Sequence, residues 1–249
     1  MRSAGRVRLD KLLVDRGLVP SRERAQALVL AGKVLVAEQK VEKPGSSVDP
    51  QAAIRLLSDD QRYVSRGGIK LEHALKHWHI NVAGKSCLDV GASTGGFTDC
   101  LLQHDAASVI AVDTGYGQLA LRLRNDKRVR LLERTNARYL TAEQIGVGVD
   151  FVAMDVSFIS ATLVLPAVMQ AARPGEIAVL VKPQFEVGRE RVGKKGIVRD
   201  AEAQREAVEK VKQALVALGG RDIDVTESPI KGAEGNREFL LHARFDANG

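Results

Sequence analysis

Short apolar runs alternate with stretches of helical periodicity along most of the chain. The runs with the length and composition of buried strands are residues 86–90, 108–112, 129–132, 151–154, 177–181, 223–226 and 238–243. The stretches with helical periodicity are residues 97–103, 119–124, 163–172 and 202–218. Strands that alternate with helices in this way predict an α/β fold with a doubly wound, mostly parallel sheet, in which the last two strands form an antiparallel pair.

The first 59 residues have a different pattern and are predicted to form a separate, small α+β domain. Leu9, Leu12 and Leu13 share one face of a first helix, and Ser21 is placed to cap a second helix. Short apolar runs that follow the second helix predict a small sheet.

The second domain is expected to comprise residues 60–249, with the polar residues 58–61 interpreted as a linker. Gly67 and Gly68 then interrupt the chain, and a helix is predicted to begin near Ile69. The residues of this helix that are expected to face inward are Leu71, Ala74 and Leu75. This helix is expected to pack beneath the sheet.

The composition is that of an ordinary soluble protein, with 45% hydrophobic and 27% charged residues in a chain of 249. The net charge of +6 favours an anionic partner, and nucleic acid before membrane. No apolar run approaches the ~20 residues that span a bilayer, and the N-terminus lacks an apolar signal core. We therefore expect a cytoplasmic protein without a membrane partner. Cys87 and Cys100 form no Cys-x-x-Cys pair, so neither a metal site nor a disulfide framework is indicated.

A turn rich in glycine follows the first strand of the large domain. Residues 89–97 read Asp-Val-Gly-Ala-Ser-Thr-Gly-Gly-Phe, and such a turn between a strand and a helix lets backbone amides approach a ligand. The turn lacks the Gly-Lys-Ser/Thr of a phosphate-binding P-loop and the spacing of the dinucleotide fingerprint. It resembles motif I of S-adenosylmethionine-dependent methyltransferases, which implies S-adenosyl-L-methionine as the cofactor.

An acidic residue, Asp113, follows the next strand about 20 residues beyond this turn, where ribose hydroxyls usually find their partner. The alternative for Asp113 is a solvated carboxylate that opens the following turn. Methyltransferases commonly line the adenine site just after the third strand, which implies Asn136. The candidate cofactor-binding residues are Asp89, Gly91, Ala92, Ser93, Thr94, Gly95, Gly96, Phe97, Asp113, Asn136 and Asp155.

The small N-terminal domain, with two helices before a short sheet and cations on the helices, resembles the S4 RNA-binding domain. The resemblance is carried by residues 8–13, 21–25 and 30–36. It implies that one basic face meets RNA phosphates, and the candidate RNA-binding residues are Arg8, Lys11, Arg22, Arg24 and Lys33. The alternative is a solvated charged face on an accessory domain.

A long loop is predicted between residues 184 and 200. It carries several cations, namely Arg189, Arg191, Lys194 and Lys195. Loops of this length are uncommon in compact domains unless they have a function.

Four motifs together resemble one family over essentially the whole chain. They are the glycine turn, Met-Asp-Val-Ser-Phe at 154–158, Val-Lys-Pro-Gln-Phe-Glu at 181–186 and Gly-Asn-Arg-Glu at 235–238. The family is that of the TlyA (haemolysin-A-like) ribosomal RNA 2'-O-methyltransferases, a branch of the FtsJ-type enzymes that carries an N-terminal S4 domain. The resemblance implies a class I (Rossmann-like) methyltransferase sheet and methyl transfer to a ribose 2'-hydroxyl, of a cytidine, in ribosomal RNA or ribosomal subunits.

FtsJ-type enzymes use a Lys-Asp-Lys-Glu tetrad, which the resemblance places at Lys70, Asp155, Lys182 and Glu238. Asp155 and Lys182 each follow a predicted parallel strand, at the edge of the sheet where the cofactor is expected. Lys182 is the expected catalytic residue, either as acceptor of the hydroxyl proton or as a cation that orients the oxygen. For any one of the four, the alternative is an ion pair at a strand end.

Two other functions stay open at this point. One is a membrane-active haemolysin, which the family's name suggests and no long apolar segment supports. The other is an RNA-binding ribosome assembly factor without catalytic activity. Neither the target nucleotide and its ribosomal subunit nor the oligomeric state follows from the sequence.

Overall fold

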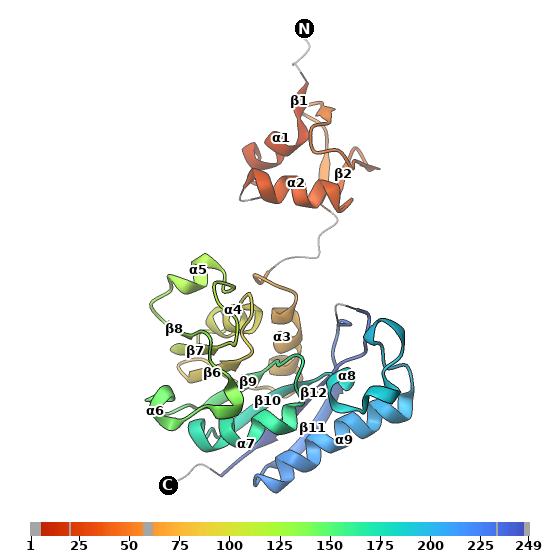
Figure 1. The fold of residues 1–249 in the computed structure, drawn as a ribbon. Helices are drawn as coiled ribbons and strands as arrows, with labels where there is room; N and C mark the ends of the chain where they lie inside the picture. Colours follow the sequence, from red (N-terminus) through yellow and green to blue (C-terminus); the bar gives the residue numbers. More distant parts are fainter. Residues whose placement is uncertain (1–5, 20, 57–61, 233, 247–249) are drawn as a thin grey trace. The chain divides into compact units, whose positions relative to one another are not determined.

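The computed structural model describes residues 6–19, 21–56, 62–232 and 234–246. The chain forms two compact units, residues 1–61 and 62–249, which are described separately (Figure 1). The linker predicted at residues 58–61 lies outside the described residues.

The small unit packs two helices against short strands. Its elements are β1 (Val7–Arg8), α1 (Leu9–Asp15), α2 (Arg22–Leu30), β2 (Val34–Val36), β3 (Gln39–Lys40), β4 (Ser47–Val48) and β5 (Ile54–Leu56). β1 pairs with β4, and β2 lies between β3 and β5 in an antiparallel sheet. Leu9 and Leu13 of α1 are fully buried beside Val29 of α2. Ser21 caps α2, since its hydroxyl accepts a hydrogen bond from the amide of Arg24 at 3.3 Å.

The large unit is organised around one sheet of seven strands, in the order β11-β12-β10-β9-β6-β7-β8. These strands are β6 (Ser86–Val90), β7 (Ser108–Val112), β8 (Val129–Leu132), β9 (Phe151–Met154), β10 (Glu176–Val181), β11 (Arg221–Glu227) and β12 (Phe239–Arg244). β6 to β10 are parallel, whereas β12 runs antiparallel to both β10 and β11. The predicted α/β fold is therefore confirmed. The strand order reverses between β6 and β9, and open α/β sheets bind ligands at such a point.

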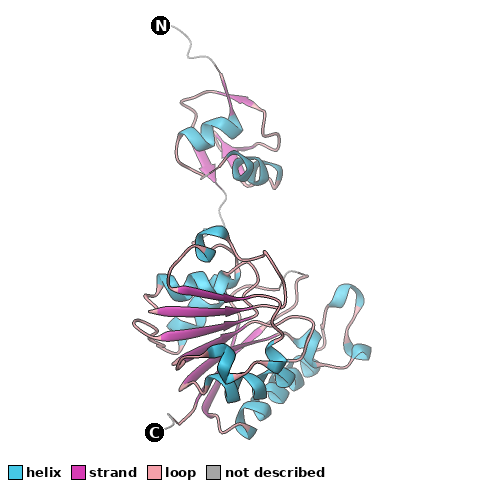
Figure 2. Cartoon of the chain, turned by 60° about the vertical axis from the view of Figure 1, so that its left-hand side comes forward, coloured by secondary structure: helices cyan, strands magenta, loops and turns pink. Residues whose placement is uncertain are grey.

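Helices cover both faces of this sheet (Figures 1 and 2). α3 (Gly67–His77) and α4 (Gly96–Gln103) contribute to the core on one face, and α7 (Ala161–Ala172) and α9 (Ala201–Ala217) to the core on the other. The shorter helical elements are α5 (Leu121–Arg124), η1 (Ala137–Tyr139), α6 (Ala142–Ile145), α8 (Pro183–Glu186), η2 (Arg189–Arg191) and η3 (Lys194–Gly196). Because both faces are covered, β6 buries Leu88 on one side and Cys87 on the other, which explains the continuous apolar runs in the sequence.

α3 begins at Gly67, two residues before the predicted start, so the two glycines belong to the helix instead of interrupting the chain. The reason is close packing around the first turn of α3. A Cβ atom at Gly68 would lie 2.2 Å from the ring of Tyr63, and one at Gly96 of α4 would lie 2.2 Å from Ser65 Oγ. Glycine at these positions lets the first turns of α3 and α4 approach each other.

The segment predicted as a long loop contains three short helical pieces, α8, η2 and η3. Across the part of the chain that the structure describes, no helix has both the length and the apolar character needed to cross a membrane.

Candidate active site

Two adjoining cavities open where the strand order reverses, at the carboxyl ends of β6 and β9. Their volumes are about 300 and 270 Å³, and both are lined by Gly91, Ser93 and Asp155. Gly91 has a φ of +88°, and a Cβ atom there would lie 2.3 Å from the carbonyl oxygen of Asp155. The glycine turn therefore brings bare backbone to the point where the two cavities meet.

The first cavity, of about 300 Å³, is lined by all four predicted tetrad residues. Lys70 Nζ lies 2.5 Å from Glu238 Oε2, and Lys182 Nζ lies 2.6 Å from Asp155 Oδ1. Lys182 Nζ also donates a hydrogen bond to Ser157 Oγ at 2.7 Å. The tetrad thus forms two ion pairs in one cavity wall, with each lysine held by one carboxylate.

The sheet register explains how residues far apart in sequence meet here. Asp155 and Lys182 each follow the last residue of a parallel strand, β9 and β10. In the antiparallel pairing of β10 with β12, Val181 lies opposite Phe239, so the next residue on one strand faces the residue before the other strand. Lys182 and Glu238 therefore lie at the same edge of the sheet. Lys70 reaches this edge from the first turn of α3.

The second cavity, of about 270 Å³, contains the predicted ribose and adenine residues, Asp113 and Asn136. Asp113 Oδ2 accepts a hydrogen bond from the amide of Ser93 at 2.7 Å, and Oδ1 accepts one from the amide of Gly115 at 2.6 Å. Each carboxylate oxygen has a further lone pair for a ligand. Asn136 caps η1 through a 3.0 Å hydrogen bond from the amide of Arg138.

Two of the predicted cofactor-binding residues, Asp89 and Gly95, do not line either cavity. Asp89 is fully buried beneath the glycine turn, where its Oδ2 accepts a 2.6 Å hydrogen bond from Thr98 Oγ1. Its Oδ1 has no hydrogen-bond partner among the described residues. This burial raises the pKa of Asp89 to about 7. The other nine candidates line one or both cavities, and they are Gly91, Ala92, Ser93, Thr94, Gly96, Phe97, Asp113, Asn136 and Asp155.

Sequence reasoning missed several residues of the cavity walls. Ser65, Arg66 and Gly67 line the first cavity, and Ser157 and Phe158 line the second. Phe158 is 92% exposed and has a φ of +63°, which is unusual for a bulky residue. A phenylalanine directly after the Asp-Val-Ser motif at the end of β9 was the available signal. Its ring lies 5.3 Å from the ring of Phe185, centroid to centroid.

In the small unit, two of the predicted RNA-binding cations converge on a buried carboxylate. Asp10 Oδ2 lies 2.9 Å from Arg8 Nη2 and 3.2 Å from Arg22 Nη2, and it also accepts a hydrogen bond from Gln26 at 3.1 Å. The hydrogen bond from Arg8 is the main reason that the pKa of Asp10 lies far below its usual value. Asp10 thereby holds both guanidinium groups, which are each about half exposed.

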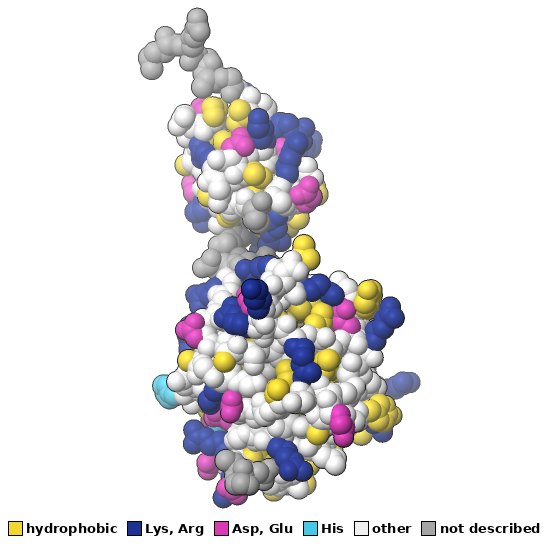
Figure 3. Space-filling view, turned by 90° about the vertical axis from the view of Figure 1, so that its left-hand side faces the viewer, with side chains coloured by type: hydrophobic (Ala, Val, Ile, Leu, Met, Phe, Trp, Pro, Cys, Tyr) yellow, Lys and Arg dark blue, Asp and Glu magenta, His cyan; other side chains and the backbone are white. Residues whose placement is uncertain are grey.

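The other three predicted cations differ in their exposure. Lys11 is exposed on α1, whereas Arg24 of α2 and Lys33, just before β2, are partly buried. Lys and Arg side chains are spread over the visible faces of both units, and hydrophobic side chains lie between them (Figure 3).

Comparison with protein families separates the same two parts of the chain. Residues 63–245 match the model of the FtsJ-like methyltransferases, and residues 7–54 match that of the S4 domain.

Individual relatives cover nearly the whole chain. The 16S/23S rRNA (cytidine-2'-O)-methyltransferase TlyA of Mycobacterium tuberculosis is 49% identical over 97% of this chain and 91% of its own length. Hemolysin A of Brachyspira hyodysenteriae is 41% identical over 95% of this chain and 99% of its own. A solved structure described as a hemolysin from Streptococcus thermophilus has a TM-score of 0.76 and 42% identity, and the match covers 98% of this chain and 90% of that one. With both family models in order and such relatives along almost its full length, the chain belongs to the FtsJ-like methyltransferases, in the TlyA family that joins an S4 domain to the methyltransferase domain.

Proposed function

We propose that this chain transfers the methyl group of S-adenosyl-L-methionine to the 2'-hydroxyl of a cytidine ribose in ribosomal RNA. The observation that carries the proposal is the tetrad in the wall of the first cavity, with its 2.5 Å and 2.6 Å ion pairs, next to the cavity that contains Asp113. The relative from Mycobacterium tuberculosis is named for methylation of cytidine 2'-oxygens in 16S and 23S rRNA, which supports the choice of substrate.

The residues present fit S-adenosyl-L-methionine. The second cavity offers the Asp113 carboxylate to ribose hydroxyls and Asn136 to an adenine. At Gly91 a Cβ atom would collide with the carbonyl oxygen of Asp155, so only glycine fits there, and Gly91 lines both cavities. If the adenosine portion of the cofactor lies in the second cavity, its amino acid portion would extend into the first cavity, which Lys70 and Lys182 also line.

The cofactor supplies an electrophilic methyl group on a sulfonium centre, and the tetrad acts on the hydroxyl that attacks it. Lys182 is fixed by Asp155 and by Ser157, so its ammonium group has a defined position at the cavity wall. We assign Lys182 to orient the 2'-oxygen for in-line approach, and the Lys182–Asp155 pair would take up the proton that the hydroxyl loses. Lys70 and Glu238 form the second ion pair in the wall of the same cavity.

Two features outside the tetrad suit an RNA substrate. The ring of Phe158 is exposed at the second cavity, and aromatic rings at such positions stack on unpaired bases. In the small unit, the guanidinium groups of Arg8 and Arg22 are held together by Asp10 and can meet phosphates. A cytoplasmic location follows from ribosomal RNA as the substrate.

The proposal is tested by transfer of a radiolabelled methyl group to ribosomal subunits purified from cells that lack this gene. The wild-type chain is expected to label one or both subunits, and Lys182→Ala to do so at least ~100-fold more slowly with cofactor and subunit binding nearly unchanged. The matched control is Lys127→Ala, which removes an exposed lysine before β8 at the opposite edge of the sheet. A folded Lys182→Ala protein with substantial turnover would reduce the Lys182–Asp155 pair to a structural salt bridge.

A further inference from the structure

The segment between α8 and α9 carries a group of cations that the proposed mechanism does not use. We propose that residues 188–200, called the basic loop below, form a second RNA-binding surface, on the catalytic unit, that contacts phosphates next to the target ribose. This inference rests on the proposed function, because it adds a contact surface for the same RNA.

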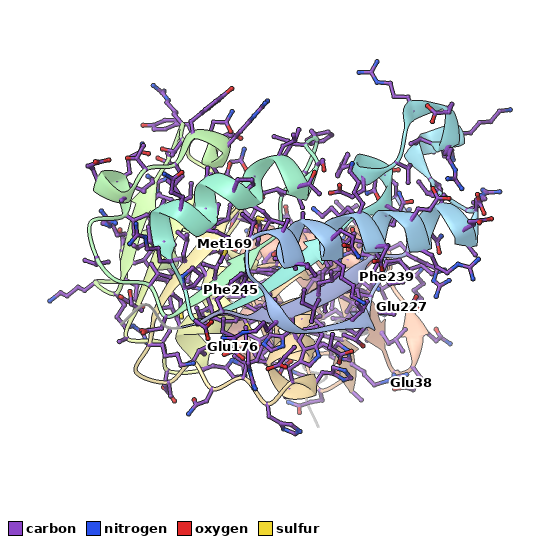
Figure 4. The ribbon with its side chains drawn as sticks, turned by 90° about the horizontal axis from the view of Figure 1, so that it is seen from below. Glu38, Met169, Glu176, Glu227, Phe239 and Phe245 are labelled. Atoms are coloured by element: carbon purple, nitrogen blue, oxygen red, sulfur yellow. The ribbon has the colours of Figure 1, made fainter. Side chains whose placement is uncertain are left out.

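The side chains of four cations of the basic loop are exposed and make no hydrogen bond or ion pair with the described residues: Arg189, Lys194, Lys195 and Arg199. The fifth cation, Arg191, is partly buried and is paired with Asp200 at 2.7 Å and also with Glu206. With Glu190 as its other carboxylate, the loop keeps a net positive charge after its internal pairing. Side chains extend outward from this loop, at the upper right of Figure 4.

The loop is held in one conformation by a buried side chain from another part of the chain. Asn236 is only 2% exposed, and both the oxygen and the nitrogen of its side-chain amide form hydrogen bonds with the loop. Its Nδ2 donates to the carbonyl of Gly196 at 2.8 Å, and its Oδ1 accepts from the amide of Val198 at 2.9 Å. Gln204 of α9 adds a 2.7 Å hydrogen bond to the carbonyl of Val198. The cations therefore project from a fixed backbone, which lowers the entropy cost of binding.

The same anchor connects the loop to the candidate active site. Asn236 precedes the tetrad residue Glu238 by two positions, and its carbonyl accepts a 2.9 Å hydrogen bond from the amide of Gly232. Lys231 and Ile230, just before that glycine, line the first cavity beside Glu238. The ribbon shows the loop rising beside the segment that leads into β12 (Figure 1). An RNA whose target ribose enters the first cavity would therefore pass close to the loop.

The chemistry of the loop favours the phosphate backbone over the bases. Residues 188–200 contain no aromatic side chain and none of the amide side chains that read base edges. Lys194 and Lys195 are adjacent like charges at the tip, where Lys195 and Gly196 both have positive φ angles of 62° and 72°. An anionic partner relieves that repulsion. The loop should thus mainly add affinity and position.

The test compares two pairs of substitutions in the full-length protein, each of which removes two positive charges. Lys194→Gln with Lys195→Gln removes the loop tip's charge, and Lys127→Gln with Arg173→Gln removes the same charge at the amino edge of the sheet, before β8 and β10. Binding to 30S and 50S subunits from cells lacking the gene is measured over a range of salt concentrations. We expect the loop pair to weaken binding about 10-fold and to reduce the salt slope by about 1 to 2, with cofactor affinity unchanged. The control pair should leave all three quantities as in the wild type.

A double-mutant cycle tests the role of Asn236 as a positioning residue. Asn236→Ala should weaken subunit binding in the wild-type background and cause little further loss in the Lys194→Gln, Lys195→Gln background, because the cations it positions are already gone. Equal losses in both backgrounds would overturn this role of Asn236.

The outcomes separate this inference from the proposed function. If the wild-type chain methylates a subunit and the loop pair binds with unchanged affinity and salt slope, the basic loop is not an RNA contact, while the proposed function stands. If the wild-type chain transfers no methyl group to either subunit, the proposed function itself fails.

Discussion

At the scale of single residues, Asp89 makes the stability of the large unit depend on pH. Its carboxyl group is fully buried and its pKa is raised from 3.8 to about 7, mainly by burial. A raised pKa means that the folded state binds the proton more tightly than the unfolded state. The contribution of protonated Asp89 to the free energy of unfolding is therefore complete below about pH 4, and it is lost as the pH rises toward 7.

The variant Asp89→Asn removes this titration and keeps the size of the side chain. We expect the melting temperature of the wild type, relative to that of Asp89→Asn, to fall between pH 4 and pH 7 and to level off above. Within this window the difference in unfolding free energy changes by up to about 1.4 kcal/mol per pH unit. A difference between the two proteins that is constant from pH 4 to pH 8 would show that Asp89 is ionised throughout.

Asp113 is the residue that we expect to hold the cofactor ribose. Asp113→Ala should weaken binding of S-adenosyl-L-methionine, measured by calorimetry, by about 1–3 kcal/mol, because hydroxyl groups of the ligand lose a charged hydrogen-bond acceptor. The carboxylate also binds the amides of Ser93 and Gly115, so the thermal melting of the variant is measured alongside. Unchanged affinity would remove Asp113 from the cofactor site.

Motif resemblance named the tetrad, but sequence could not show how its members pair. Lys70 binds Glu238 and Lys182 binds Asp155, a choice that depends on the register of β12 against β10. The role of Asp10 was equally hidden, since an aspartate in a first helical turn gives no sign that two arginines will converge on it. Contacts of this kind depend on tertiary packing, which periodicity does not encode.

At the scale of elements, the approach of α3 to α4 brings Lys70 to the cavity. Gly96 allows this approach, because a Cβ atom there would lie 2.2 Å from Ser65 Oγ and 2.9 Å from the amide nitrogen of Gly68. We expect Gly96→Ala to destabilise the large unit by about 1–3 kcal/mol and to lower methyl transfer as α3 shifts. The control is Gly148→Ala, since a Cβ atom at Gly148 meets no atom within 4 Å. Equal melting temperatures for the two variants would contradict this account of the packing.

The strands were easier to predict than the helix ends. β6, β7, β8 and β9 have the predicted bounds, and for β6, β7 and β9 the reason is burial on both faces, which leaves largely apolar runs between polar turns. α3 begins earlier than predicted, because its glycines serve close packing and do not break the helix. The short helical pieces between β10 and α9 also escaped prediction, since their conformation is fixed by distant partners such as Asn236.

At the scale of the whole molecule, the small unit should supply most of the RNA affinity, while the large unit keeps cofactor binding and the contacts near the target ribose. A chain that starts at Asp60 lacks the Arg8 and Arg22 group. It should bind S-adenosyl-L-methionine like the full chain and methylate subunits much more slowly at limiting concentrations. Its binding to subunits should also depend less on salt, by roughly 0.7 log units per decade for each lost contact to single-stranded RNA. Full-rate methylation by the shortened chain would contradict this division.

The central claim, methylation of a ribosomal RNA ribose by the tetrad, is tested most directly by mapping 2'-O-methyl groups in ribosomal RNA. The map is compared between the source organism, a strain lacking this gene, and that strain carrying either the wild-type gene or Lys182→Ala. We predict that at least one cytidine loses its 2'-O-methyl group in the deletion strain, regains it with the wild-type gene and does not regain it with Lys182→Ala. Identical maps in all four strains, or full restoration by Lys182→Ala, would contradict the claim.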